Sequence, residues 1–353
     1  MPREKVCLVG SGNWGSTIAR IIGANTAAHP ETFEREIQMW VFEEVVGGKK
    51  LTEIINTTHE NVKYLPGAKL PPNVVANPSL ASAASGATML IFVLPHQFLR
   101  RICPDILRSM APRCKAISLI KGIEFEAGRP KLISSMIHEA LSAAVPVSVL
   151  MGANVASEVA KDEFCEATIG CADAAAAAAW RLLFDRPTFR IQTVDDVAGV
   201  ELCGALKNVM ALAAGIADGL GYGDNAKAAI LSRGIVEMQR YGLACGADPQ
   251  TFFGLAGVGD LAVTAFSKHG RNRAFGERIG RGETLEQALA SSPKVAEGVW
   301  TAKVVGAASR ERGVEMPIAD AVTKVLYEGL PPAQAVRALM ERDPKAEGAS
   351  TSS

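Results

Sequence analysis

Short, uninterrupted apolar runs recur through the first half of the chain, each bounded by turn residues and separated from the next by a helix-length segment. A run without polar alternation is typical of a strand that is covered on both faces. The regular alternation therefore predicts an α/β fold with a doubly wound, mainly parallel sheet. We expect strands at residues 6–9, 37–42, 89–94, 116–120 and 147–151, and helices that include 14–23, 97–110 and 131–141.

The hydrophobic pattern changes near residue 195. Before it, two further strand candidates at 167–169 and 189–194 flank an alanine run, which we interpret as a packed helix because alanine is the best helix former. After Asp195 and Asp196, which are plausible helix caps, strand signals nearly disappear and helical patterns run to Arg342. We therefore expect an α/β domain at 1–195, an all-helical C-terminal domain at 196–345 and a disordered tail at 346–353.

Length and charge limit the classes of partner. A chain of 353 residues is long enough for two hydrophobic cores. Its 37 basic and 37 acidic residues cancel without forming a basic block, so we expect no nucleic-acid or membrane partner. We also see no apolar run that approaches the roughly 18 residues needed to span a bilayer. Partners are expected to be small molecules and other subunits.

Cysteine and histidine usage points to a reducing compartment without a metal site. The seven cysteines form no C-x-x-C pair, which suits reduced thiols rather than a disulfide framework. The N-terminus runs directly into a strand pattern and lacks a signal-peptide profile. The five histidines are scattered and lack the spacing of metal ligands. We expect a cytoplasmic protein with no bound metal.

A glycine-rich loop follows the first expected strand and opens a helix. The sequence Gly10-Ser11-Gly12-Asn13-Trp14-Gly15 is a complete G-x-G-x-x-G motif. Here Gly10 makes the tight turn, Gly12 lets the backbone approach a pyrophosphate, and Gly15 lets the helix pack on the strand. The helix N-terminus offers free N–H groups to the phosphates. In this context the motif predicts a Rossmann-like domain that binds a dinucleotide.

Acidic residues at the end of the second strand favour NAD over NADP. A carboxylate of Glu43 or Glu44 can accept a hydrogen bond from the ribose 2′-hydroxyl of NAD and would repel the 2′-phosphate of NADP. The long spacing from the glycine motif is explained if residues 26–36 are a surface insertion. The nearby Lys49 and Lys50 leave NADP as the less favoured alternative.

Polar residues follow three of the expected strands at their carboxyl ends, where ligands bind in open parallel sheets. These residues are His96, Lys121 and Asn154. A lone cation after an apolar strand indicates contact with an anion or a polarised oxygen, although Lys121 could also extend its ammonium group to solvent. For His96, a neutral imidazole bonded to the backbone is as good an interpretation as a catalytic role.

A lysine interrupts the most apolar helical segment of the chain. Between residues 202 and 217 the only polar side chains are Lys207 and Asn208, so this helix should be buried. Burial lowers the pKa of a lysine because the charged form loses hydration, and that favours proton transfer near neutral pH. Lys207 is therefore the proton-transfer candidate. A structural ion pair with Asp260 is the alternative, and the two interpretations are compatible.

A basic turn at residues 269–273 is a candidate phosphate site. The planar guanidinium of Arg271 or Arg273 matches a phosphate in two hydrogen bonds, and Asn272 with nearby backbone N–H groups could complete the site. Both arginines could equally be solvated loop charges.

Together, these segments resemble the NAD-dependent glycerol-3-phosphate dehydrogenase family, with matches spread from Val6 to about Leu339. The ordered set is far more specific than any one motif. It comprises residues 10–15, 40–44, 95–98, 118–122, 151–154, 206–208, 259–261 and 270–272.

The resemblance implies a role for each matching residue. Lys207 would transfer the proton with support from Asn154, Asp260 and Thr264, and Lys121 would contact the substrate. Arg271 and Asn272 would hold the substrate phosphate. The cofactor would lie along Gly10, Ser11, Gly12, Asn13, Trp14, Gly15, Phe42, Phe98, Ala156 and Arg271, together with Val295 and Glu297, which match the bacterial branch of the family.

The implied reaction interconverts dihydroxyacetone phosphate and sn-glycerol 3-phosphate by hydride transfer to or from NAD, and the resemblance implies a homodimer. Two other functions remain open at this point. A β-hydroxyacid dehydrogenase pairs a similar first domain with a helical domain that carries a lysine, and its substrate bears a carboxylate. A redox sensor would bind NADH and a partner without turnover, although two desolvated lysines argue against it.

Overall fold

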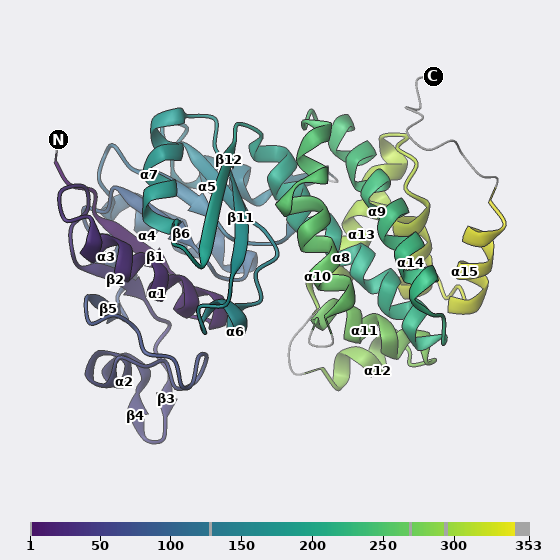
Figure 1. Ribbon diagram of the computed structural model, residues 1–353, viewed down its shortest axis with the longest axis horizontal. Coiled ribbons are helices and arrows are strands. Elements are labelled where there is room, and N and C mark those ends of the chain that lie inside the picture. The colour runs from purple at the N-terminus through teal and green to yellow at the C-terminus, as the bar shows by residue number, and fades with distance from the viewer. Residues whose placement is uncertain (1, 127–128, 268–269, 293–295, 343–353) are drawn as a thin grey trace.

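The structure of the protein is a computed structural model, and it describes residues 2–126, 129–267, 270–292 and 296–342. A part built around a sheet and a part built from helices lie side by side along the long axis of the molecule (Figure 1). The mainly parallel sheet followed by helices confirms the expected fold class.

The sheet has eight strands in the order β12-β11-β10-β7-β6-β1-β2-β5, and each neighbouring pair from β5 to β10 is parallel. All five strands expected in the first half are present, with ends within two residues of the expected ones. The strands are β1 Val6–Val9, β2 Ile37–Trp40, β5 Val74–Asn77, β6 Met89–Phe92, β7 Lys115–Ser118, β10 Val147–Met151, β11 Cys165–Gly170 and β12 Phe189–Val194.

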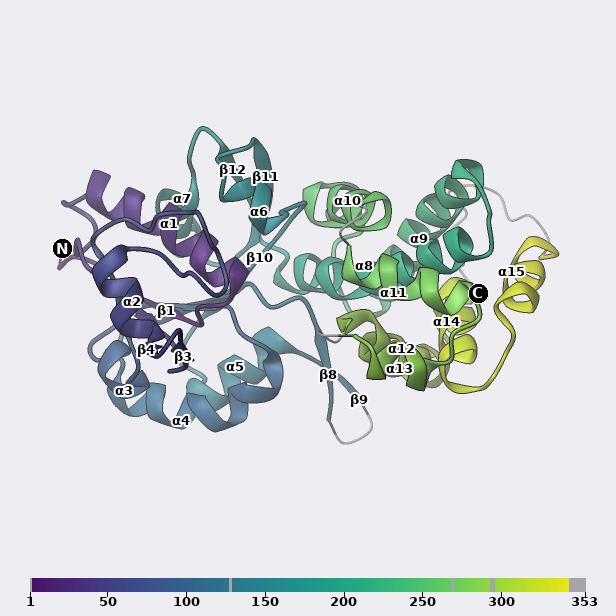
Figure 2. The same ribbon diagram turned by 90° about the horizontal axis from the view of Figure 1, so that it is seen from below.

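Helices cover both faces of this sheet, which explains the continuous apolar runs. On one face α1 Asn13–Ala28 and α7 Ala174–Phe184 pack in one hydrophobic cluster with Leu8 of β1. On the other face α4 Leu99–Ser109 and α5 Ile133–Leu141 pack in a second cluster with Cys7 of β1. Figure 2 shows these two helical layers on opposite sides of the strands.

Three features of the sheet part were not predicted. The edge strand β5 was missed because it is short and follows two prolines. Strand β11 runs antiparallel to β10, with Leu150 opposite Ile169. Two small hairpins, β3 Val45–Val46 with β4 Lys49–Lys50 and β8 Ile123–Glu126 with β9 Arg129–Leu132, also lie outside the main sheet.

The helical part surrounds α8, Val197–Gly219, whose residues 199–217 are all buried. By length and composition α8 could cross a membrane, so the expectation that no apolar run has that length was wrong. Its complete burial identifies it as a core helix. The surrounding helices are α9 Asp224–Ala244, α10 Asp260–Phe266, α11 Arg271–Gly280, α12 Leu285–Ala290, α13 Glu297–Glu311, α14 Pro317–Tyr327 and α15 Pro332–Met340.

Glycines bring α8 and α11 into backbone contact. A Cβ on Gly215 would lie 2.0 Å from the Arg273 carbonyl oxygen, and one on Gly276 would lie 2.2 Å from that of Leu212. Likewise, a Cβ on Gly219 would lie 2.2 Å from the Glu277 carbonyl oxygen, and one on Gly280 would lie 2.3 Å from that of Ile216. Because no side chain fits between them, the first turn of α11 is held at a fixed distance from α8.

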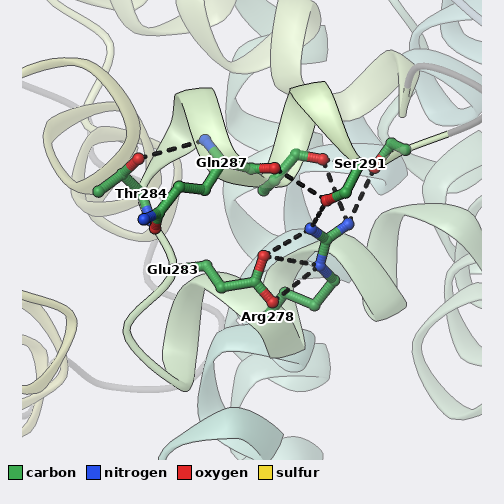
Figure 3. Close-up of polar contacts among 7 residues, drawn as sticks. Arg278, Glu283, Thr284, Gln287 and Ser291 are labelled. Carbon is green, nitrogen blue, oxygen red and sulfur yellow. Dashed lines mark hydrogen bonds and ion pairs between the residues drawn. The ribbon is translucent and has the colours of Figure 1, made fainter.

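The side chain of Arg278, near the end of α11, forms hydrogen bonds to the segment that contains α12 (Figure 3). Arg278 donates to both carboxylate oxygens of Glu283 at 3.0 Å from Nε and to Ser292 Oγ at 3.0 Å from Nη1. A capping box between Thr284 and Gln287 begins α12. The planar fork of the guanidinium donates from three nitrogens in fixed directions, whereas a lysine donates from one nitrogen only. This network sets the direction in which the chain leaves α11.

Candidate active site

The two lysines singled out in the sequence meet at one carboxylate. Lys207 Nζ in α8 donates to Asp260 Oδ1 at 2.6 Å, and Lys121 Nζ beyond β7 donates to Asp260 Oδ2 at 2.6 Å. Asp260 is the first residue of α10, follows a π-helical turn at Leu255–Gly259, and is 1% exposed. The cluster therefore links the carboxyl edge of the sheet to the core helix of the second part.

Two further contacts complete the environment of these ammonium groups. Lys207 Nζ also donates to Thr264 Oγ1 at 2.6 Å, one turn beyond Asp260 on the same helix. Lys121 Nζ also donates to the Gly152 carbonyl at 2.9 Å. Lys121 therefore points inward to fixed acceptors, which contradicts the solvent-directed alternative. The ion pair expected between Lys207 and Asp260 is present.

Asn154 lies close to this cluster, on the loop that carries Gly152. Its Nδ2 donates to the Glu166 carbonyl at 3.1 Å. Its Oδ1 is buried and has no hydrogen-bond partner among the described residues. A buried amide oxygen without a partner is costly, and this one is therefore available to accept a hydrogen bond from a ligand.

The charges of the cluster make Lys207 suitable for proton exchange. The pKa of Lys207 is lowered to about 8; burial is the largest cause, Asp260 opposes it, and the nearby charge of Lys121 adds to the lowering. Two ammonium groups share one carboxylate, so the cluster carries an excess positive charge. Near pH 8 Lys207 can either give or take a proton, and the neighbouring cation can stabilise an oxyanion.

The structure separates the two candidate phosphate-binding arginines. Arg273 pairs with Asp218 at 2.7 Å and Glu277 at 3.1 Å, so it serves the fold. Arg271, at the start of α11, is exposed, and no ion pair of its side chain occurs among the described residues. Arg271 is the one of the two that is able to meet an anion.

Asn272 is held from two sides. Its Nδ2 donates to Asn208 Oδ1 at 2.8 Å, and its Oδ1 accepts from the Gly298 backbone N–H at 2.9 Å. Asn208 is the neighbour of Lys207 on α8, so the start of α11 is tied to the helix that carries the proton-transfer candidate. Gly298 lies in the first turn of α13, next to Glu297.

The glycine loop has the geometry that its sequence predicted. Gly10 has φ 118°, and a Cβ there would lie 2.2 Å from the Val93 carbonyl oxygen. A Cβ on Gly15 would lie 2.3 Å from the Gly10 oxygen, whereas a Cβ on Gly12 would meet nothing within 4 Å. Helix α1 begins directly after Gly12. Two glycines are thus required by packing, and the third leaves open space beside the free N–H groups.

The polar residues of the loop are fixed by protein contacts. Asn13 Nδ2 donates to the Tyr64 carbonyl at 2.7 Å, and Trp14 packs edge-on against Phe189 with ring centroids 6.3 Å apart. The Ser11 carbonyl accepts from Asn61 Nδ2 at 2.8 Å. Asn61 was not predicted, because its position some fifty residues beyond the loop gives no sequence signal.

The remaining cofactor candidates are dispersed around the sheet edge. Phe42 and Phe98 are 64% and 44% exposed, which leaves their rings available for stacking. Ala156 begins the short helix α6, Ala156–Val159, and Glu297 begins α13. Val295 lies outside the described residues.

The carboxylates expected near the adenosine ribose already have protein partners. Glu43 accepts from Thr52 Oγ1 at 2.6 Å and from the Thr52 N–H at 3.2 Å. Glu44 accepts from Lys63 at 2.6 Å and from the Tyr64 hydroxyl at 2.9 Å. Helix α2, Leu51–Thr58, begins beside Glu43 and offers it N–H groups, which the sequence spacing did not reveal. Discrimination against a 2′-phosphate by these residues therefore rests on their charge.

His96 is 2% exposed, and its Nε2 lies 3.5 Å from Glu124 Oε2. Its Nδ1 has no hydrogen-bond partner among the described residues, so the interpretation of His96 as an imidazole bonded to the backbone finds no support at this atom.

A dinucleotide loop on a doubly wound sheet, with two lysines that share a buried carboxylate beyond the strand ends, is typical of a nicotinamide-dependent oxidoreductase. Residues 5–177 match the family described as NAD-dependent glycerol-3-phosphate dehydrogenase N-terminus, and residues 196–337 match the corresponding C-terminus.

Relatives agree with this match along the whole chain. The cytoplasmic NAD(+) glycerol-3-phosphate dehydrogenase of Pongo abelii is 49% identical over 348 residues, which are 96% of this chain and 98% of that protein. The glycerol-3-phosphate dehydrogenase structure from Plasmodium falciparum has a TM-score of 0.90 at 34% identity and covers 98% and 97% of the two chains. The one from Coxiella burnetii has a TM-score of 0.85 at 28% identity, with 96% and 99% covered.

The chain therefore belongs to the NAD-dependent glycerol-3-phosphate dehydrogenase family, and it is an NAD-dependent oxidoreductase that acts on a CH–OH group. The resemblance seen in the sequence is confirmed. Because the chain belongs to this family, the two alternative functions, a β-hydroxyacid dehydrogenase and a redox sensor without turnover, are excluded.

Two glycine substitutions separate the needs of the fold from those of the cofactor. We expect Gly12→Ala to leave thermal stability unchanged, because its Cβ meets nothing, but to raise the Kd for NADH about 10-fold by crowding the pyrophosphate. Gly15→Ala should instead lower the free energy of unfolding by about 1–3 kcal/mol through its backbone clash. Fluorescence titration and urea denaturation measure both. Unchanged NADH affinity in Gly12→Ala would show that no phosphate lies there.

Proposed function

We propose that the protein interconverts dihydroxyacetone phosphate plus NADH and sn-glycerol 3-phosphate plus NAD+, with Lys207 as the general acid and base. The observation that carries this proposal is the cluster in which Lys207 and Lys121 share Asp260. When bound, the nicotinamide supplies or accepts the hydride. The side chains of the chain hold the substrate oxygen and move its proton.

Each member of the cluster has a distinct task. In the reductive direction, Lys207 Nζ gives its proton to the oxygen that develops negative charge. Lys121 is the second cation at that oxygen, and it stabilises the charge without giving up a proton. Asp260 orients both ammonium groups, Thr264 fixes the second contact of Lys207, and Asn154 supports the loop that binds Lys121.

The non-reacting phosphate is held at the start of α11. Arg271 has no acidic partner among the described residues, and Asn272 is fixed by Asn208 and Gly298. The N-terminus of α11 adds N–H groups and a favourable dipole. Because the phosphate does not react, its binding energy can position the carbonyl against the cluster.

NAD binds along the glycine loop in this proposal. Gly10, Ser11, Gly12, Asn13, Trp14 and Gly15 face the pyrophosphate, the exposed rings of Phe42 and Phe98 flank the adenosine and nicotinamide parts, and Ala156, Arg271, Val295 and Glu297 complete the site. The negative charges of Glu43 and Glu44 disfavour NADP. Residues 1–195 form the cofactor domain and 196–345 the substrate domain. As the names of its relatives suggest, the protein acts in the cytoplasm.

The pH dependence of the two directions tests Lys207. Reduction needs the protonated lysine, so its kcat/KM should fall as pH rises through about 8; oxidation needs the neutral lysine and should rise through the same pH. NADH absorbance measures both rates. Lys207→Met should lower kcat about 1,000-fold or more while NADH still binds. Residual activity within tenfold of the unaltered protein would assign proton transfer to another group.

A substrate panel tests Arg271. At saturating NADH, which offsets any loss of the proposed cofactor contact of Arg271, we expect Arg271→Ala to lower kcat/KM for dihydroxyacetone phosphate about 10- to 100-fold, because a charge-assisted hydrogen bond to phosphate is lost. The slow reduction of dihydroxyacetone should be nearly unchanged. Arg281→Ala, at the far end of the same helix, is the matched control, since Arg281 is exposed and pairs with Glu277. Equal losses on both ketones would remove Arg271 from the phosphate site.

The proposal includes a homodimer. Exposed apolar side chains on the helical part, among them Val236 and Leu243 of α9 and Phe253, offer an interface. Light scattering after size-exclusion chromatography should give twice the chain mass of 37.2 kDa. A mass of one chain at micromolar concentration would exclude the dimer.

A further inference from the structure

A second buried carboxylate joins α8 to the sheet part, away from the substrate. Glu201 is 0% exposed and accepts from the Ser134 backbone N–H at 3.0 Å and from the Ser134 hydroxyl. Ser134 lies in the first turn of α5, whose own N-cap position is Leu132 and supplies no side-chain cap. The N-terminus of a helix in the sheet part is therefore capped by a residue of the core helix of the other part.

We propose that Glu201 is a positioning residue for the reaction, which holds α8 against the sheet so that Lys207 stays opposite Lys121 while substrate binds. This inference rests on the proposed function, because it takes Lys207 and Lys121 to meet the substrate oxygen.

Besides its apolar packing on Val149 and Met151, α8 has two polar links to the sheet part among the described residues, and these links lie at different points along the helix. Lys121 is tied to α8 through Asp260 and Lys207, and Ser134, farther along the same stretch of chain, is tied to α8 directly by Glu201. At 1.5 Å per residue, Glu201 and Lys207 are separated by roughly 9 Å along the helix axis. A helix held at two such points cannot slide or turn about either one.

Only one of the two links changes its charge during the reaction. Each ammonium group uses two of its three donors on protein acceptors, so a third can meet the substrate oxygen, and the pairing of Lys207 with Asp260 weakens when Lys207 gives up its proton. Glu201 is sealed from solvent and bonded to Ser134, so its link can persist. Misplacement of a catalytic group by about 1 Å can lower the rate 100-fold. The Glu201 link would prevent such a displacement of Lys207.

Stability alone is a poor explanation for a carboxylate at this position. Burial raises the pKa of Glu201 to about 7, and the hydrogen bonds of Ser134 only partly oppose this effect. A buried charged group is costly, and apolar replacements are often as stable.

The chain contains a matched control for this site. Glu237 of α9 is also buried, has its pKa raised to about 7 by burial, and accepts from the Ile318 N–H at 2.8 Å and the Ala319 N–H at 3.2 Å at the start of α14. Both ends of this contact lie in the helical part. Glu237 thus has the chemistry of Glu201 without joining the two parts.

The test compares Glu201→Gln with Glu237→Gln in the full chain. Both should lower the urea midpoint, because each removes a helix-capping carboxylate. Only Glu201→Gln should lower kcat for dihydroxyacetone phosphate, by about 10-fold, with the Kd for NADH within twofold of the unaltered value. Its pH–rate midpoint should move above about 8, because a looser cluster rehydrates Lys207. Equal kcat values and pH midpoints in the two variants would overturn the proposal.

Ser134→Ala provides a second route if Glu201→Gln does not fold. It removes the hydroxyl donor and keeps the backbone N–H, so we expect a loss in kcat of about 3-fold, and the double variant should be no slower than Glu201→Gln. An unchanged kcat in Ser134→Ala would contradict the link, and so would losses from Ser134→Ala and Glu201→Gln that add in full in the double variant. The interpretation of the kcat comparison assumes only that the protein catalyses the reaction of its family. The interpretation of the pH midpoint also assumes that Lys207 transfers the proton. An active Lys207→Met would therefore refute the role of Lys207 in the proposed function, and the kcat comparison would then decide only whether the Glu201 contact serves the reaction.

Discussion

The structure of this protein depends on one carboxylate that serves two lysines. Asp260 neutralises only one of the two charges, and the three side chains come from the end of a strand, the middle of a core helix and the start of a short helix. Such an arrangement is costly to bury unless every group has a partner. The sheet edge, α8 and α10 must therefore meet in one place, and the arrangement of the two parts follows from this requirement.

Helix α8 transmits that requirement to the rest of the molecule. Its contact with α11 sets the position of Asn272 through Asn208, and Glu201 at its other end reaches α5. Helix α8 thus contacts the lysine cluster, the candidate phosphate site and the sheet part. The position of the lysine cluster accordingly depends on α8 and its neighbours together with the loops that follow β7 and β10.

The sequence predicted what depends on local pattern. Three features could be read from the sequence: the strands buried on both faces, the glycine loop, and Lys207 within an apolar helix. Each one either follows a regular pattern of apolar residues or interrupts such a pattern. The reversal of β11, the role of Asn61 and the Thr52 partner of Glu43 could not be read from the sequence, because they depend on segments that only folding brings together. The difference between Arg271 and Arg273 had the same origin, since Asp218 lies far from both in the sequence.

The glycine contact between α8 and α11 separates two kinds of constraint in the helical part. Apolar side chains around α8 are constrained by volume, so a larger residue at one position can be offset by a smaller one nearby. Gly215, Gly219, Gly276 and Gly280 are constrained by the distance between two backbones, for which no neighbouring change compensates. A redesign of the helical part can therefore exchange apolar side chains around α8 if their total volume is kept, while the spacing of α8 and α11 remains a constant of the architecture.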